Sequence, residues 1–199
     1  MKRHTSAIAR LQSLPPVFRG SDLTIRFQWT SKTASQYLYL WKRRGLVQSL
    51  GGKSDVYANL LTTPAPDWEN ALLMAMPSAV TIGVEALRQA GWTTQVPHRP
   101  AVAVNSQQSV FTVEPFEIAP RDPAWFDAAS GGIQGRRPGL AALRPAWALA
   151  DMLHTQGWGK CGLWPDDIDW EHISAKDKKD WQAACSTFGL PCAPLKPPK

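Results

Sequence analysis

The periodicity of residues 31–44 limits the fold of this chain more than any other feature. Apolar side chains recur there at i, i+3, i+4 and i+7, namely Ala34, Tyr37, Leu38 and Trp41. This spacing places them on one face of an α-helix, and the other face is polar. Thr30 or Ser31 can cap the start of the helix, and Gly45 can end it. The segment therefore predicts an amphipathic helix with one buried face.

A β-hairpin is expected directly after this helix. Two short apolar stretches, 46–50 and 56–60, flank the glycine-rich polar segment 51–55. Two further helices are expected before it, one over 5–13 and a short one that opens at 20–22. Three helices followed by a hairpin is the order of a winged helix-turn-helix module, which we expect over residues 1–62.

The rest of the chain predicts a second domain over residues 67–190. Pro64 and Pro66 mark a linker before it. Helices are expected at 67–76, 79–90, 140–154 and 174–187, several short strands within 92–118, and a flexible glycine-rich loop at 130–139. Within 140–154, Pro145 suits the first turn, which places the start of the helix proper near Arg144. The proline-rich end, 191–199, is expected to be a flexible tail. The fold class predicted is α+β, with a winged helix-turn-helix followed by a mixed α/β domain.

The positive charge of the chain is concentrated in its first segment. The whole chain has a formal net charge of +6, but residues 1–60 hold ten lysines and arginines against two acids, and residues 61–199 have a net charge of −2. An asymmetry of this kind favours a polyanionic partner for the first segment. A basic face that is simply solvated is the alternative reading of the same charge.

Double-stranded DNA is the polyanion that a winged helix-turn-helix predicts. The N-terminal polar residues of its recognition helix reach base edges in the major groove. The candidates for base contacts are Ser31, Lys32, Ser35 and Gln36. The candidates for phosphate contacts are Arg19, Ser21, Lys42, Arg43 and Lys53. Lys42 and Arg43 also suit the dipole at the helix C-terminus, an equally weighted alternative. Lys2, Arg3 and His4 form a possible minor-groove arm, although a solvated tail is favoured.

No catalytic or metal site is predicted, and no cofactor. The four histidines are scattered, and the glycines of 130–137 match neither a P-loop nor a dinucleotide-binding motif. Three cysteines do not make a disulfide framework, so Cys185 and Cys192 are interpreted as ordinary core or surface thiols. The acidic run at 166–171 is interpreted as a solvated turn. The sequence contains neither a long apolar span nor a signal peptide, which predicts a cytoplasmic protein.

Three segments resemble AbiE-type antitoxins: 41–47 with its hairpin up to Tyr57, 78–97, and 143–154. The resemblance implies an antitoxin of a type IV toxin–antitoxin pair. Its first domain would repress its own operon, and its second would counteract a nucleotidyltransferase-like toxin. It places DNA contacts at Ser31, Lys32, Ser35, Gln36 and Lys53. The likeness ends near residue 155. An adaptor that binds only protein remains the alternative function, and the sequence leaves monomer and dimer open.

Overall fold

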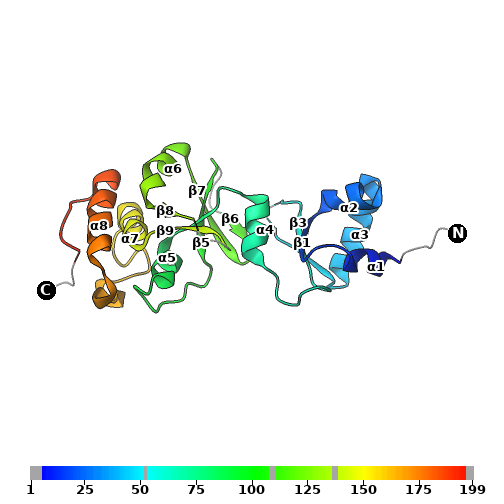
Figure 1. The fold of residues 1–199 in the computed structure, drawn as a ribbon, viewed down its shortest axis with the longest axis horizontal. Helices are drawn as coiled ribbons and strands as arrows, with labels where there is room; N and C mark the ends of the chain where they lie inside the picture. Colours follow the sequence, from blue (N-terminus) through cyan, green and yellow to red (C-terminus); the bar gives the residue numbers. More distant parts are fainter. Residues whose placement is uncertain (1–5, 52, 108–110, 136–138, 196–199) are drawn as a thin grey trace. The chain divides into compact units, whose positions relative to one another are not determined.

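The structure is a computed structural model that describes residues 6–51, 53–107, 111–135 and 139–195. The chain divides into two compact units, which we describe separately (Figure 1). The first comprises the residues up to Pro77 together with Thr112–Glu114, and the second comprises the remainder. The division therefore falls after Pro77 and not in the expected linker between 62 and 67. The fold class is α+β, with helices and two separate sheets.

The first unit contains the expected helices and hairpin, and one strand that was not expected. Its elements are α1 (Ala7–Gln12), β1 (Val17–Arg19), α2 (Gly20–Phe27), α3 (Ser31–Arg43), β2 (Val47–Ser49), β3 (Val56–Asn59) and α4 (Trp68–Ala75). β1 pairs with β3 antiparallel, Phe18 opposite Tyr57, so the hairpin grows into a three-stranded sheet of order β1-β3-β2. The prolines after α1 end that helix and leave the following residues extended.

The apolar face of α3 is buried as its period predicts. Ala34, Leu38 and Trp41 are at most 9% exposed, and Tyr37, the fourth predicted position, is half-buried. The side chain of Thr30 accepts a hydrogen bond from the amide of Thr33 at the start of the helix, and Gly45 adopts φ +66° just after its end. Both predicted helix boundaries are therefore confirmed.

The helix expected to open the second domain, α4, packs on the first unit. It contacts β3 and β1, and its residue Met74 accepts a hydrogen bond through its carbonyl from the guanidinium of Arg19. Asp67 caps its start as expected, accepting from the amide of Asn70 at 3.0 Å. The apolar face of α4 thus covers the sheet of the first unit. The first unit then ends at Pro77, two residues after this helix.

A mixed six-stranded sheet, of order β6-β7-β5-β4-β9-β8, organises the second unit. Its strands are β4 (Val80–Thr81), β5 (Ala101–Asn105), β6 (Phe111–Val113), β7 (Phe116–Arg121), β8 (Ile133–Gln134) and β9 (Ala141–Leu143). Its helices are α5 (Gly83–Gln89), α6 (Pro123–Ala129), α7 (Pro145–Thr155) and α8 (Ala175–Phe188), with 3-10 turns at Ser130–Gly132, Pro165–Asp167 and Trp170–His172. α7 packs against both α5 and α8 (Figure 1).

Two predicted helical segments of the second unit begin with residues that join the sheet; in the second of them the helix starts at Pro145, next to the predicted start near Arg144. Within 79–90, Val80 and Thr81 pair with Ala103 and Val102, and the helix begins only at Gly83. Within 140–154, residues 141–143 form β9, parallel to β4, and Pro145 then takes the first turn of α7. The three consecutive β-branched residues at 80–82 favour a strand. The prediction missed this strand because it extended the helical period of the following residues back across them.

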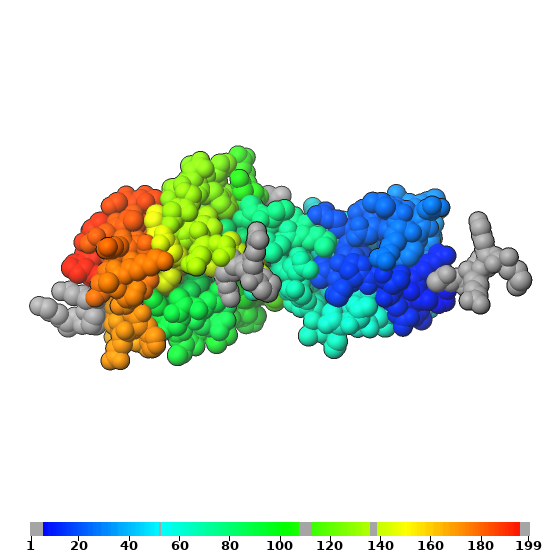
Figure 2. Space-filling model, viewed as in Figure 1, coloured from blue at the N-terminus to red at the C-terminus, as the bar shows by residue number. Residues whose placement is uncertain are grey.

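The predicted glycine-rich loop at 130–139 contains regular structure. Ser130–Gly132 is a 3-10 turn that leads into β8, although 136–138 lie outside the described residues. Residues 191–195, predicted as the first part of a flexible tail, contact α8. Trp181 donates from Nε1 to the carbonyl of Ala193 at 2.8 Å, and Leu195 is buried at 9% exposed. A buried indole N–H needs an acceptor, and the returning chain supplies it. Figure 2 shows the last described residues, in red, next to the orange of α8.

A buried carboxylate joins α7 to β7 and α6. Asp151 is 2% exposed, and its two oxygens accept hydrogen bonds from Trp125 Nε1 at 2.8 Å and from the guanidinium of Arg121 at 3.3 Å. A charge taken out of water is tolerated only when it is paired in this way. Among the helices of the described residues, none is long and apolar enough to cross a membrane.

Gly132→Ala is expected to destabilise the second unit, whereas Gly131→Ala is not. A Cβ on Gly132 would lie 2.3 Å from Cγ of Trp147, but one on Gly131 would meet the same ring at an ordinary 3.5 Å. Overpacking of this kind costs about 1–3 kcal/mol or more. Thermal unfolding measured by calorimetry should show a clear drop in Tm for Gly132→Ala alone. Equal Tm values for the two variants would contradict the packing described here.

Candidate nucleic-acid interface

One face of α3 gathers the residues that the sequence nominated for base contacts. The exposed side chains of this helix include Ser31, Lys32, Ser35, Gln36, Tyr39, Lys42 and Arg43. They lie opposite the buried Ala34, Leu38 and Trp41, because residues three and four apart share a helix face. No acidic residue occurs anywhere in α3. The helix therefore presents hydroxyl, amide, phenol and cationic groups together.

Tyr39 was not among the predicted contact residues, although it lies near the middle of this face. Its side chain is 60% exposed, and the guanidinium of Arg43 lies 5.8 Å from its ring centroid. An aromatic ring held in water beside a cation is suited to contact a partner through both its apolar face and its hydroxyl. The sequence signal was available, since Tyr39 lies four residues after Ser35 and three before Lys42.

Two shallow grooves flank α3. One lies between α3 and the hairpin, with a volume of about 260 Å³, and includes Ser35, Tyr39 and Lys42 in its walls. The other lies between α2 and α3 and includes Ser21 and Ser31. Asp55, at the start of β3, lines both grooves. Several of the predicted contact residues therefore line a groove on one side of α3 or the other.

The N-terminus of α2 is already occupied by two carboxylates. Asp55 accepts from the amide of Ser21 at 2.9 Å, and Asp22 accepts from the amide of Arg19 at 2.8 Å. The guanidinium of Arg19 donates to the carbonyl of Met74. The positive end of the helix dipole is therefore neutralised within the protein. Arg19 and Ser21, nominated as phosphate anchors, have structural partners in this unit, and we leave them out of the interface.

Asp55 is the positioning residue that sequence reasoning missed. Its carbonyl accepts from the amide of Gly20 at 2.9 Å, and a Cβ on Gly20 would lie only 2.3 Å from its carboxylate. A glycine at that position lets the hairpin approach the start of α2. Burial, and then the charge of Asp55, raise the pKa of Tyr57. The sequence held one indication of this role: Asp55 is one of only two acidic residues among the ten lysines and arginines of residues 1–60.

The predicted wing residue, Lys53, lies exposed in the hairpin turn with φ +62°. This left-handed backbone conformation is uncommon for residues other than glycine and asparagine. Lys42 and Arg43 extend the cationic surface at the end of α3. Within the described part of the chain, no acidic side chain forms an ion pair with these three cations. Lys2, Arg3 and His4, the possible arm, lie outside the described residues.

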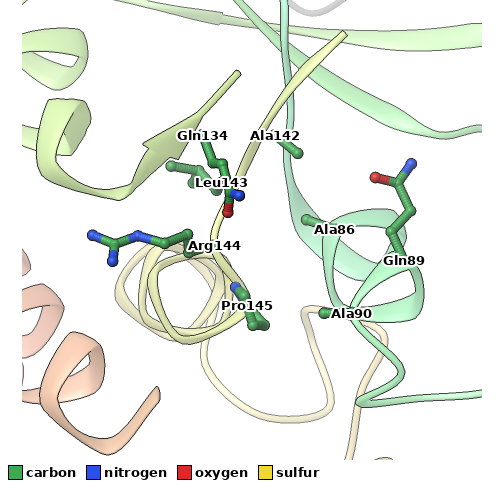
Figure 3. Close-up of a pocket in the computed structure, with 8 residues that line it drawn as sticks. All are labelled: Ala86, Gln89, Ala90, Gln134, Ala142, Leu143, Arg144 and Pro145. Carbon is green, nitrogen blue, oxygen red and sulfur yellow. The ribbon is translucent and has the colours of Figure 1, made fainter. Parts of the chain in front are cut away.

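A separate cavity in the second unit has mainly apolar walls. It lies between α5 and the junction of β9 with α7, with Gln89 and Gln134 as its uncharged polar residues (Figure 3). Arg144 lines the cavity only with the part of the residue near the backbone. Its guanidinium points away from the cavity and donates from Nη1 to Oδ2 of Asp180 at 2.7 Å. No group of three or more His, Cys, Asp or Glu able to hold a metal occurs among the residues that the structure describes.

Comparison with known proteins yields a relation at the level of fold. No protein-family model matches the chain, and no curated protein matches it. Among solved structures, it is similar to the crystal structure of the RV2827C protein from Mycobacterium tuberculosis, with a TM-score of 0.55 and 15% sequence identity. The match covers 93% of this chain and 76% of that chain. At this identity the likeness concerns the fold alone.

Asp55→Ala is expected to destabilise the first unit by about 1 kcal/mol, because the amide of Ser21 loses its acceptor. Asp55→Asn keeps an acceptor and loses only the charge, so its cost should be a few tenths of a kcal/mol. Chemical denaturation followed by tryptophan fluorescence can measure both. A loss for Asn as large as that for Ala would mean that the charge, and not the hydrogen bond, holds the hairpin to α2.

Proposed function

We propose that the first unit is a winged helix-turn-helix module that binds double-stranded DNA, with α3 as its recognition helix. The observation that carries this proposal is the exposed face of α3, which has no acidic residue and groups Lys32, Ser35 and Gln36 at its N-terminal half. The order of elements, α1-β1-α2-α3-β2-β3 with a three-stranded sheet, supports it. An α-helix with such a face fits the major groove.

Each polar group on α3 has a chemically matched target in the proposed complex. The amide of Gln36 can pair with adenine through two hydrogen bonds, and Lys32 can donate to guanine or to a phosphate. Tyr39, further along the helix, offers a ring for a thymine methyl. Lys42, Arg43 and the hairpin residue Lys53 would hold the sugar–phosphate backbone on either side. Affinity would then depend steeply on salt, because phosphate contacts release counterions.

We further propose that the whole chain is a cytoplasmic transcriptional regulator without catalytic activity, the antitoxin of a type IV toxin–antitoxin operon that it represses. Support comes from the resemblance of 41–57, 78–97 and 143–154 to AbiE-type antitoxins. On this proposal the first unit supplies repression, and the second counteracts a nucleotidyltransferase-like toxin.

The combined substitution Lys32→Ala and Gln36→Ala should weaken binding to the promoter upstream of the gene by at least about fivefold, as expected for loss of a base contact worth about 1–3 kcal/mol. Gel shifts at low salt measure this. Lys176→Ala, an exposed cation on α8 in the other unit, is the matched control and should leave binding unchanged. Absence of any shift with the unmodified protein, or equal shifts for all three proteins, would overturn the proposal.

Co-expression tests the antitoxin role. The gene next to that of this chain is expected to encode a nucleotidyltransferase that arrests growth when induced alone, and co-expression of the full chain should restore growth. The Lys32→Ala, Gln36→Ala protein should still restore growth, because those side chains lie in the DNA-binding unit. Failure of the unmodified chain to restore growth would refute the antitoxin role and leave the DNA-binding proposal standing. A stable protein complex without DNA affinity would support the adaptor instead.

A further inference from the structure

The last described segment of the chain folds back along α8. Gly189 ends the helix with φ +68°, and residues 190–195, which we call the C-terminal strap, return beside it. The contacts that hold the strap include the hydrogen bond from Trp181 Nε1 to the carbonyl of Ala193, that from the amide of Leu190 to the carbonyl of Cys185, and the burial of Leu195. The strap therefore has a defined position on the helix and a defined set of neighbours.

The return of the chain brings Cys192 next to Cys185. The sulfur of Cys192 lies 3.9 Å from the carbonyl oxygen of Gln182 and 4.0 Å from Oγ of Ser186. Gln182 and Ser186 are four positions apart, one turn of α8, and Cys185 belongs to the same turn. The sulfur of Cys192 therefore lies against the turn of the helix that carries Cys185.

The two thiols have contrasting surroundings. Cys192 is exposed, and Cys185 is fully buried in the core of the second unit. Burial first, and then the charge of Cys192 and a hydrogen bond with it, raise the pKa of Cys185 to about 11. Cys192 is thus accessible to an oxidant in solution, whereas the buried Cys185 is shielded from it. In this arrangement Cys192 is the thiol that an oxidant reaches first, and Cys185 is the resolving thiol that can react with the oxidised Cys192.

We propose that Cys185 and Cys192 form a redox-modification site, in which oxidation closes an intramolecular disulfide that ties the C-terminal strap to α8. A hydroperoxide is the co-reactant. The thiolate of Cys192 attacks the outer peroxide oxygen and becomes a sulfenic acid, releasing an alcohol, or water from hydrogen peroxide. The sulfur of Cys185 then attacks the sulfenic sulfur, its proton leaves with the hydroxyl as water, and the S–S bond forms. Two thiols are oxidised and one peroxide is reduced.

Cys161 is the internal control for this proposal. It is partly exposed, and its sulfur lies 3.8 Å from the carbonyl of Leu163, in the segment between α7 and α8. The chain therefore contains one thiol of intermediate exposure that is outside the pair. General reactivity towards peroxide would modify Cys161 as well, but ring closure requires the geometry of the strap. The proposal is independent of DNA binding, because both cysteines lie in the second unit.

The test is treatment of the full-length, reduced protein with a small excess of hydrogen peroxide, followed by denaturation and thiol titration. The three free thiols should fall to one, and the tryptic peptide that begins at Asp180, which contains both paired cysteines and not Cys161, should lose the mass of two hydrogen atoms. Dithiothreitol should restore both values. Cys161→Ser should show the same mass loss, and Cys192→Ser, which changes an exposed residue, should show none.

A rise in pH should speed ring closure, because the fraction of Cys185 present as thiolate increases up to its raised pKa. Several outcomes would overturn the proposal: sulfinic acid at Cys192 with Cys185 still reduced, disulfide-linked dimers in place of the internal ring, or the same mass loss in Cys192→Ser. Cys185→Ala, if it folds, should convert the product to a stable sulfenic or sulfinic acid at Cys192. Unfolding of that variant leaves the Cys192→Ser comparison decisive.

Discussion

The first unit depends on the packing of the aromatic face of α3. The ring of Trp29 stacks on that of Tyr37 with centroids 4.4 Å apart, and Trp41 lies behind them, 1% exposed. Aromatic contacts of this kind combine a large buried area with a defined geometry. They fix the rotation of α3 about its own axis, and that rotation decides which of its side chains remain in water. The composition of the exposed face of α3 is therefore a consequence of the core beneath it.

Much of this arrangement was predictable from the sequence, because its causes are local. The period of Ala34, Leu38 and Trp41 gave the buried face of α3, and Thr30 and Gly45 gave its ends. The neighbours of α2 could not be predicted in the same way. Asp55 reaches Ser21 across 34 positions of sequence, and the guanidinium of Arg19 reaches Met74 across 55. A hydrogen bond between two polar groups far apart in the chain produces no periodic pattern in the sequence from which it could be predicted.

The second unit shows the same limit for strands. Val80 and Thr81 continue a helical pattern, yet their backbone groups pair with β5 on one side and β9 on the other. Three of the tryptophans here are buried: Trp92, Trp147 and Trp181 are each at most 7% exposed. Others are half-buried against the same core, and Trp164 is 63% exposed. The buried Asp151 fixes α7 through one indole and one guanidinium.

The contact of Arg10 with its neighbours has a consequence for how the charge of the first segment is counted. Its guanidinium lies 5.2 Å from the ring of Trp29 and 5.8 Å from that of Phe27, so this cation stabilises the module itself. Arg19 is likewise committed to a carbonyl. In the complex we propose, the ions displaced from DNA would reflect the uncommitted cations near α3 and the hairpin. The formal charge of the segment is thus an upper limit on its electrostatic valence.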